Sequence, residues 1–275
     1  MEMEFLIIDT NKCKRDGFCA KDCPATIIRL PQKGFPEIIP GFEKACLECG
    51  HCVAVCPHGA LGHERIPIAQ SPVILEDLRI NEAQATQFLR SRRSVRHFLN
   101  KPVEKEKIQR IIEVARYAPT GGNSQMVEWI VWRDKSKIRE IAGLTIDWLR
   151  EIIKIPQVTE ASPYLPLAVA SWDAGKDSVL RDAPAVIIAM APKEALNGTV
   201  DLTIALSYLD LFAPMLDLGT CWAGLVQGAM VNSRAVKAAA GVPESYPHHY
   251  PIMLGYPEFE FHRLPERRAP KITFA

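Results

Sequence analysis

Hydrophobic positions are distributed unevenly along the 275-residue chain, and their pattern divides it into two parts. Residues 1–65 contain only short apolar segments between polar turns, whereas apolar residues recur with helical or strand periods from residue 81 onward. A segment that buries so little apolar surface needs another source of folding free energy, and bound metal is a common one in small domains. The proline-containing stretch 66–80 has no helical period, so we expect it to link domains over 1–65 and 81–275.

The second part is predicted to begin with two helices. Asn81 is a good N-cap, and Gln84 stands in the capping-box position three residues later. Between Pro102 and Pro119, apolar residues at 108, 111, 112 and 115 form one face of a second helix. Proline disfavours helical backbone in the residue before it, so this helix should end before Pro119.

Further elements follow from the length and composition of the apolar segments. Strands are expected over 127–132, 184–190 and 251–256, and short ones over 4–8 and 37–39. Helices are expected over 138–154 and 200–218, with Pro214 shortening or kinking the second, and a short helix should end near residue 240. The proline-containing stretch 156–172 is predicted to be irregular, and the glycine-flanked segment 219–224 to be a turn. Strands that interleave irregularly with many helices indicate the α+β class.

Seven of the eight cysteines lie in one stretch between Cys13 and Pro57. From Cys46 to Pro57 the spacing is C-x2-C-x2-C-x3-C-P, the pattern that binds cubane iron–sulfur clusters in bacterial ferredoxins. The first half of the stretch repeats this pattern at an offset of 33 residues, except that Asp16 stands where the second half has Cys49. A pair of structural zinc sites is the competing interpretation, but zinc ribbons need two separated pairs of cysteines.

The repeat predicts two clusters, because the fourth cysteine of each run binds the other cluster in two-cluster ferredoxins. One complete 4Fe–4S site is expected from the following four thiolates: Cys46, Cys49, Cys52 and Cys23. The other site would have Cys13, Cys19 and Cys56, with Asp16 at the fourth corner. A carboxylate is a harder and weaker iron ligand than a thiolate, so this second site is either a labile 4Fe–4S or a 3Fe–4S centre. Alternatively, Asp16 is an ordinary loop residue that never contacts iron.

Composition excludes several classes of function. A net charge of +1 leaves no basic excess for nucleic acid. The most apolar segment, 202–218, carries Asp210 and Asp217, so we expect a buried helix and no membrane span. Clustered thiols without a disulfide framework indicate a reducing compartment, and residues 1–9 have no basic region typical of a signal peptide. We therefore expect a cytoplasmic protein.

Three separated pieces of the second part suit a phosphate-bearing flavin. They are the segment with Arg92, Arg93, Ser94 and Arg96, the loop around Asn123, and the tail with Arg267 and Arg268. Arginine and serine bind phosphate well, and an amide side chain can bond the polar edge of a flavin ring. Arginines at the end of a helix are also common dipole partners and solvated charges, so the residues alone leave both interpretations open.

The same pieces resemble the nitroreductase flavoprotein family. The resemblance rests on Arg-Arg-Ser-Val-Arg at 92–96, on Ala-Pro-Thr-Gly-Gly-Asn-Ser-Gln at 118–125, on Leu-Gly-Thr-Cys-Trp-Ala-Gly at 218–224 and on the arginine-rich tail. It covers about residue 85 to the end, and the whole chain resembles ferredoxin–nitroreductase fusions. Met126 and Glu266 depart from the commoner pattern of the family.

The resemblance implies an FMN-dependent homodimer with a mixed sheet flanked by helices and a flavin at each subunit interface. By this resemblance, the phosphate and the ring's polar edge would be bound by Arg92, Arg93, Ser94 and Arg96, and the phosphate also by Arg267 and Arg268. Asn123 would bond the ring, with Pro119, Thr120 and Gly121 near it. The face of the flavin would lie along Cys221, Trp222, Ala223 and Gly224.

Several other candidate side chains are expected to have structural roles. Cys221 is expected to be an inert buried thiol, and His51 a loop residue. His248 and His249 are expected in a surface or interface loop. Three aromatic residues, Trp148, Tyr164 and Trp172, lie where family members vary and often cover the substrate, although packing is the alternative.

The predicted function is that of an FMN-dependent oxidoreductase supplied by its own clusters, with ferredoxin or NAD(P)H as external donor. It would reduce a small organic acceptor such as a nitroaromatic or another conjugated electrophile. The alternatives are an electron-transfer flavoprotein that serves a partner protein, and a domain that modifies or senses a flavin. No residue identifies the substrate or a catalytic acid.

Overall fold

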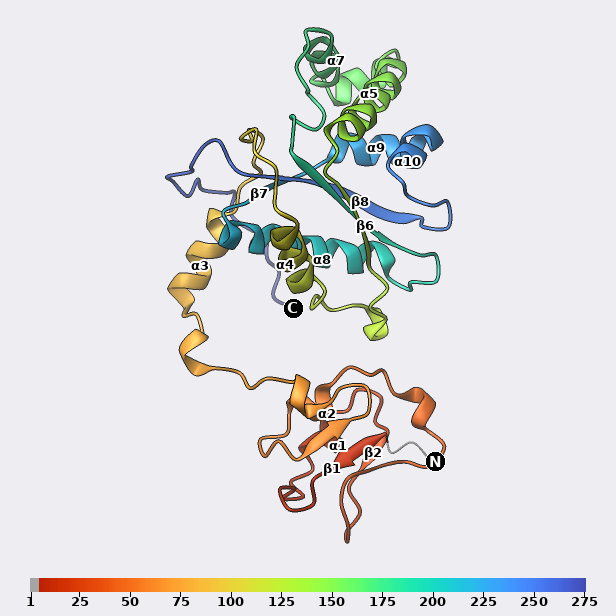
Figure 1. The fold of residues 1–275 in the computed structure, drawn as a ribbon, viewed down its shortest axis with the longest axis vertical. Helices are drawn as coiled ribbons and strands as arrows, with labels where there is room; N and C mark the ends of the chain where they lie inside the picture. The colour runs from red at the N-terminus through yellow and green to blue at the C-terminus, as the bar shows by residue number, and fades with distance from the viewer. Residues whose placement is uncertain (1–4) are drawn as a thin grey trace. The chain divides into compact units, whose positions relative to one another are not determined.

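The computed structural model describes residues 5–275, which form two compact units. The first extends to Ile80 and includes the short loop Gly122–Ser124, and the second comprises Asn81–Gly121 and Gln125–Ala275 (Figure 1). The predicted strand over 4–8 and the N-terminal segment 1–9 fall partly on residues 1–4, which lie outside the described residues.

The first unit contains two antiparallel ribbons and two short helices. Strand β1 (Leu6–Ile8) pairs with β4 (Leu61–His63), and β2 (Ile28–Arg29) pairs with β3 (Glu37–Ile38). The helices are α1 (Phe18–Lys21) and α2 (His51–Ala54), and 3-10 turns lie at η1 (Glu43–Ala45), η2 (Ile68–Gln70) and η3 (Glu76–Leu78). Its small core contains Cys19, Ile27, Ile28, Val53 and Leu61.

The 33-residue repeat of the sequence is also a repeat of the backbone. Helices α1 and α2 are offset by 33 residues, and each follows a glycine with positive φ, 75° at Gly17 and 74° at Gly50. Arg15 and Glu48 form a second matched pair, with φ of 57° and 51°. Left-handed backbone is unfavourable for residues with a Cβ, so its recurrence at matched positions shows that both halves form the same loop. The loop around Asp16 therefore has the geometry of the loop around Cys49.

The second unit is a four-stranded sheet between two groups of helices. The strands are β5 (Glu128–Trp132), β6 (Ala185–Ala191), β7 (Gly219–Trp222) and β8 (His248–Gly255), in the order β5-β6-β8-β7. The helices are α3 (Glu82–Ser91), α4 (Lys105–Ala115), α5 (Lys135–Ile152), α6 (Pro156–Ala161), α7 (Leu165–Asp173), α8 (Gly198–Phe212), α9 (Gly224–Asn232) and α10 (Arg234–Ala239). Figure 1 shows α5, α9 and α10 on one face of the sheet and α4 and α8 on the other.

Each face of the sheet has its own apolar core. Along β6, Val186, Ile188 and Met190 face the α5 side, whereas Ala185, Ile187 and Ala189 face the α8 side. All seven residues of β6 are buried, as expected for a strand covered on both faces. The α+β class is confirmed. Every pairing in this sheet is antiparallel within residues 5–275, so the mixed strand directions expected from the resemblance are not seen here.

Several predicted helix boundaries are present in the structure. Asn81 and Gln84 form the capping box at the start of α3, with backbone and side chain bonded reciprocally at 2.9 Å. Helix α4 ends before Pro119, and Pro214 ends α8, which continues only as a 3-10 turn, η5 (Ala213–Leu216). The apolar stretch Gly198–Leu216 has the length and composition of a membrane span, with 39 % of its most apolar window buried, and α8 packs against β6 and β8 of the sheet. It carries two buried carboxylates, Asp201 and Asp210.

Three local expectations were wrong. The stretch 156–172 contains helices α6 and α7, because Pro156 and Pro166 occupy the first turn, where a missing N–H costs nothing. The expected turn over 219–224 is strand β7 followed by the start of α9. Gly219 serves close packing there, since a Cβ would lie 2.4 Å from Val95 Cγ2.

The third error concerns the two adjacent histidines. They begin β8 in the middle of the sheet, and His249 is only 6 % exposed. The prolines that suggested a loop are tolerated here, because Pro251 lies in a strand whose register with β6 is kept on both sides.

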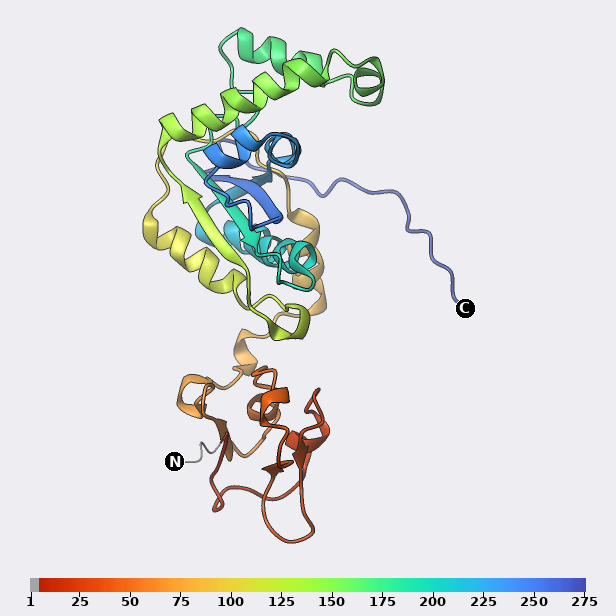
Figure 2. The same cartoon turned by 90° about the vertical axis from the view of Figure 1, so that its right-hand side faces the viewer.

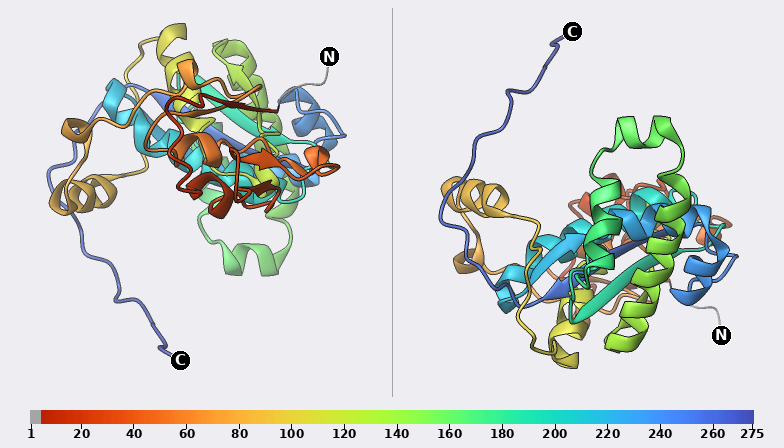
Figure 3. Two further views of the ribbon diagram at one scale, coloured as in Figure 1. Left: turned by 90° about the horizontal axis from the view of Figure 1, so that it is seen from below. Right: turned by 90° about the horizontal axis from the view of Figure 1, so that it is seen from above.

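The C-terminal segment leaves the second unit. After Tyr256, residues form no regular helix or strand, and Figures 2 and 3 show this segment running away from the sheet. Its side chains Phe259, Phe261 and Phe274 are more than half exposed.

Candidate functional site

The four cysteines expected to share one cluster line a single cavity in the first unit. They are Cys46, Cys49, Cys52 and, from the other repeat, Cys23. The cavity has apolar walls from Leu6, Ile27, Ile28 and Ile38. His63, which is 2 % exposed, places Nε2 3.6 Å from Cys46 Sγ. A hydrogen bond of this kind to a cluster thiolate tunes the reduction potential of the cluster.

A second cavity gathers the other expected ligands. Cys13, Asp16, Cys19 and Cys56 line it together, so the crossing of the fourth cysteine between repeats is present at both sites. Asp16 is held on both oxygens: Oδ2 lies 3.0 Å from His58 Nε2, and Oδ1 accepts a hydrogen bond from the Phe18 N–H at 3.3 Å. The sequence pattern did not identify His58 as a site residue, although it directly follows Pro57 of the cysteine motif.

The cysteine cavities favour binding of a cationic group. Burial, together with the neighbouring thiols Cys49, Cys23 and Cys46, raises the pKa of Cys52 to about 11. Burial likewise raises the pKa of Cys19 and Cys46. Thiolates that are costly alone become favourable beside iron, because a metal ligand must be deprotonated. No three His, Cys, Asp or Glu side chains in residues 5–275 approach closely enough for one metal ion, whereas a cluster several atoms across accepts wider spacing.

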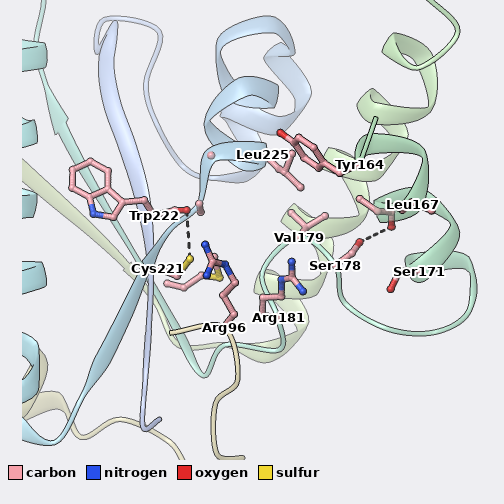
Figure 4. A pocket seen from close by; sticks show the side chains of 14 residues that line it. Arg96, Tyr164, Leu167, Ser171, Ser178, Val179, Arg181, Cys221, Trp222 and Leu225 are labelled. Atoms are coloured by element: carbon pink, nitrogen blue, oxygen red, sulfur yellow. Dashed lines mark hydrogen bonds between the residues drawn. The ribbon is translucent and has the colours of Figure 1, made fainter. Parts of the chain in front are cut away.

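The second unit contains an open cavity at the C-terminal end of β7. Cys221, Trp222, Ala223 and Gly224 line one side of it, together with Arg96. Helix α7 and the segment after it form the opposite side (Figure 4). No Asp or Glu is among the residues that line the cavity, and it contains two arginines, Arg96 and Arg181. The cavity is therefore electropositive.

The first motif contributes Arg96 to the lining of this cavity, and Ser94 forms a hydrogen bond with Cys221. Burial raises the pKa of Cys221, while the nearby Arg96 charge and a hydrogen bond from Ser94 act in the opposite direction. The thiol is 6 % exposed, so its raised pKa agrees with the expected inert role. Of the three aromatic residues considered, Tyr164 lines the cavity, whereas Trp148 and Trp172 pack against the α5-side core.

The Trp222 side chain does not lie in this cavity. Side chains alternate along a strand, so Cys221 faces the α5 side and Trp222 the α8 side. The Trp222 indole donates to Asp210 Oδ2 at 3.2 Å and meets the Tyr250 ring edge-on at 5.0 Å. Only the backbone of Trp222 therefore borders the cavity, and its contact with a flavin face stays a prediction.

Arg92 and Arg93 line a different cavity, near Thr220 and Tyr256. Arg92 Nη1 lies 3.5 Å from Asp210 Oδ2, and Arg93 Nη1 donates to the Arg92 carbonyl at 2.8 Å. Asp210 is 6 % exposed and also accepts a hydrogen bond from the Thr220 hydroxyl. Sequence reasoning missed this buried acid as a site residue, although an aspartate inside the most apolar helix was a visible signal.

The loop with Pro119, Thr120 and Gly121 is fixed elsewhere. Gly121 N–H donates to Asp201 Oδ1 at 3.0 Å, and a Cβ at Gly121 would lie 2.8 Å from Asn197 Nδ2. Neither this loop nor Asn123, which has φ of 54°, lines the Arg96 cavity or the Arg92 cavity. The chain therefore does not bring its second motif to its first.

The tail arginines also remain apart. Residues 266–268 are exposed, and Arg267 and Arg268 line neither cavity. Glu266 accepts from Arg90 Nη2 at 3.3 Å, so the residue that departs from the family pattern makes the contact with α3. Within one chain, the three pieces predicted to form one phosphate site are not assembled.

The fold and the two kinds of site define a redox protein with separate cysteine-rich and nitroreductase-like units. Residues 89–256 match the nitroreductase family, and residues 11–61 match the 4Fe-4S dicluster domain. The chain belongs to the nitroreductase family, with a dicluster domain at its N-terminal side, and is an oxidoreductase of the nitroreductase type.

Known relatives agree with this assignment. A protein of Archaeoglobus fulgidus, provisionally named NADH dehydrogenase/NAD(P)H nitroreductase, is 25 % identical over 194 residues, which cover 68 % of this chain and 94 % of that protein. An FMN reductase [NAD(P)H] of Bacillus subtilis is 32 % identical over 145 residues, 51 % of this chain and 53 % of that protein.

Two solved structures share the fold. A nitroreductase with bound FMN from Bacteroides fragilis has a TM-score of 0.57 and 20 % identity, covering 71 % of this chain and 100 % of that one. Another with bound FMN, from Desulfitobacterium hafniense, has a TM-score of 0.55 and 23 % identity, covering 72 % and 100 %.

Proposed function

We propose that the protein is an FMN-dependent oxidoreductase that receives electrons through its own iron–sulfur clusters and reduces a small organic acceptor. One observation carries this proposal: the chain contains two cysteine cavities and an electropositive cavity lined by Arg96 and Cys221–Gly224, with Ser94 hydrogen-bonded to Cys221. Acceptors of the expected class are nitroaromatics and other conjugated electrophiles. FMN supplies the hydride chemistry when it is bound.

The electropositive cavity fits the polar edge of a flavin. Arg96 offers a cation where a reduced flavin ring bears negative charge, and Ser94 adds a hydroxyl. The nine-residue helix α9 begins at Gly224 in the cavity wall, so its first N–H groups point positive partial charge toward the same space. These residues would hold the ring, and Arg92 and Arg93 would hold the phosphate.

The cysteine cavities fit two clusters. Cys23, Cys46, Cys49 and Cys52 would bind one 4Fe–4S cluster, and Cys13, Cys19 and Cys56 would bind a second, of the 4Fe–4S or 3Fe–4S type, beside Asp16. Clusters transfer single electrons, whereas reduction of an organic acceptor takes them in pairs. The two clusters would therefore deliver electrons one at a time from ferredoxin in the cytoplasm, whereas NAD(P)H, a hydride donor, would reduce the flavin directly.

A homodimer completes the proposal. Helix α8 exposes Val200 and Tyr208, the turn η5 that follows it exposes Met215, and Leu196 just before α8 is 89 % exposed. The second motif, at 118–125, and the tail arginines line neither the Arg96 cavity nor the Arg92 cavity of their own chain. A second copy that covers α8 would both bury these apolar side chains and supply the missing pieces of each flavin site.

The cavity favours a small acceptor over a partner protein as the electron sink. Tyr164, Leu167 and Ser171 of the α6–α7 region form a wall opposite the flavin motif, which is what a substrate pocket requires. An electron-transfer flavoprotein needs only an exposed ring edge. The cavity wall that these three side chains form would have no role in that alternative.

The test is anaerobic reoxidation of the purified, reduced protein. Denatured protein should release about one FMN per chain, and an adenine-containing flavin would contradict the cofactor. With reduced ferredoxin or NAD(P)H as donor, nitroaromatic and enone acceptors should reoxidise both clusters and flavin. Reoxidation by a redox protein alone, with no small acceptor active, would replace the enzyme by the electron-transfer alternative.

A further inference from the structure

The turn between α7 and β6 is built to hold one arginine at the cavity. Asp177, which is 7 % exposed, accepts hydrogen bonds from the N–H groups of Val179 and Leu180 at 2.9 Å and of Asp182 at 3.2 Å. Arg181 and Asp182 have φ of 59° and 52°, so two consecutive residues with side chains adopt left-handed backbone. Such backbone persists only where its surroundings enforce it, and it is concentrated at functional sites.

The Arg181 side chain points into the cavity beside Arg96, whereas its neighbour in the turn points elsewhere. Figure 4 shows both guanidinium groups directed toward the space between Cys221 and α7. Asp182 Oδ1 instead lies 4.0 Å from Arg139 Nη1. Among residues 5–275, no carboxylate lies within ion-pair distance of Arg181 or Arg96. The cavity therefore presents two guanidinium groups without an acid.

A cavity that contains the guanidinium groups of Arg96 and Arg181 is suited to bind two negatively charged groups. The proposed flavin provides one, at the ring edge near Arg96 and Ser94. Arg181 belongs to no flavin motif and reaches the cavity from the α7 side, where an acceptor would lie. The remaining walls on that side are Tyr164 and Leu167, which are 57 % and 70 % exposed and offer apolar surface.

We propose that Arg181 binds a carboxylate of the acceptor, so that the preferred substrates are small conjugated carboxylate anions. The flat apolar part of such a molecule would pack on Tyr164 and Leu167, and its carboxylate would pair with the guanidinium group, which suits two-point binding. This inference rests on the proposed function for its substrate class. It assigns the α7–β6 turn as the element that selects charged acceptors over neutral ones.

The test compares two nitro acceptors of nearly equal shape, 4-nitrobenzoate and 4-nitrobenzamide, on the full holoenzyme. In either case the nitro group takes two electrons from the reduced enzyme and two protons from solvent, becomes a nitroso group, and releases water. Arg181→Gln should lower kcat/KM for 4-nitrobenzoate roughly tenfold or more, the effect of one charge-assisted hydrogen bond. It should change kcat/KM for 4-nitrobenzamide by less than about twofold, because an amide gains little from the positive charge.

Three further measurements make the result specific. Arg181→Lys should restore part of the preference, and Arg139→Gln, a loss of charge outside the cavity in the adjacent helix, should leave it unchanged. Benzoate binding, measured by calorimetry or by the absorbance of the bound flavin, should weaken in Arg181→Gln without any turnover. Arg181→Asn, which tolerates the left-handed backbone better, replaces Arg181→Gln if the latter is unstable.

Distinct outcomes overturn this inference and the proposed function. Equal losses for both acceptors, or loss of FMN from Arg181→Gln, would assign Arg181 to the flavin and refute carboxylate selection. A wild-type protein without preference for 4-nitrobenzoate, or with no benzoate binding, would refute it as well. If reduced protein reacts with neither acceptor while benzoate binds through Arg181, the anion site stands and the proposed reductase activity fails.

Discussion

Asp210 and Arg92 form an ion pair beneath the first motif, with 3.5 Å between Asp210 Oδ2 and Arg92 Nη1. The same carboxylate accepts hydrogen bonds from Thr220 and Trp222 of β7. One buried acid on α8 therefore connects the first motif to strand β7, which forms the cavity edge.

Asp210→Ala should destabilise the protein strongly. The substitution leaves Arg92, the Thr220 hydroxyl and the Trp222 indole without their shared partner, and breaking a buried pair costs about 3 kcal/mol or more. Chemical denaturation should show this loss in the free energy of unfolding. Asp217→Asn is the control, because the Asp217 side chain is 88 % exposed and its pair with Lys107 at 3.5 Å should contribute little. Equal effects of the two variants would contradict the role of Asp210.

Arg96→Gln should release flavin and leave the clusters intact. Arg96 is exposed and lies at the cavity edge, so its loss removes a charge-assisted contact at little cost in stability. We expect the dissociation constant for FMN to rise roughly tenfold. Flavin fluorescence after denaturation and iron content measured on the same sample separate the two cofactors. A drop in iron with unchanged flavin would refute the assignment.

Asp16→Cys should yield a stable second 4Fe–4S centre. The loop around Asp16 already has the backbone of the Cys49 loop, with matched positive φ at Arg15 and Glu48, so a cysteine needs no rearrangement. Iron analysis and electron paramagnetic resonance should show a gain of iron and loss of any 3Fe–4S signal. His58→Gln, which removes the partner at 3.0 Å and adds no thiol, serves as the control. Unchanged iron content and spectra in Asp16→Cys would mean that position 16 does not face the cluster.

Two glycine substitutions should have opposite effects on stability. At Gly219 a Cβ would lie 2.4 Å from Val95 Cγ2 and 3.0 Å from Pro257 Cγ, so Gly219→Ala should cost about 1–3 kcal/mol by overpacking. At Gly143, in the middle of α5, a Cβ would meet Trp172 at an ordinary 3.5 Å. Gly143→Ala should stabilise the protein by about 0.5–1 kcal/mol through helix propensity. Thermal unfolding of both variants tests the pair, and a neutral Gly219→Ala would contradict the packing.

His249 should make stability depend on pH in mildly acidic solution. Burial, together with the nearby charges of Lys237 and His248, lowers its pKa from 6.5 to about 4. The unfolded chain, with the ordinary value, binds more protons between about pH 4 and 6.5, so this contribution is present above pH 6.5 and is lost as pH falls. His249→Gln should reduce the slope of unfolding free energy against pH in that window. His262→Gln, in the exposed tail, should not, and equal slopes in wild type and His249→Gln would contradict the prediction.

The cysteine sites were predictable because their information is local. Spacing and a repeat of 33 residues were sufficient to group Cys23 with the second run and Cys56 with the first, which is how the cavities gather them. The flavin motifs were predictable only as separate pieces. The order of residues in the sequence does not reveal that Arg96 and Cys221 line one cavity, or that Arg92 and Thr220 line another.

The missed features depend on tertiary contacts. Pro156 and Pro166 suggested irregular structure, yet proline is equally compatible with the first turn of a helix. Asp177, Asp210 and Arg181 show their importance only once burial and direction are known. Gly219 was interpreted as a turn residue, whereas the close approach of Val95 requires it.

The exposed apolar side chains of α8 and η5 have a consequence for every measurement of stability. A copy that associates through Val200, Tyr208 and Met215 adds an association term to the free energy of unfolding, and this term grows with the logarithm of protein concentration. The melting temperature of the assembled protein would then not be a single number. The melting temperature would rise as the protein is concentrated and fall as it is diluted. The occupancy of any flavin that both copies hold would change in the same direction.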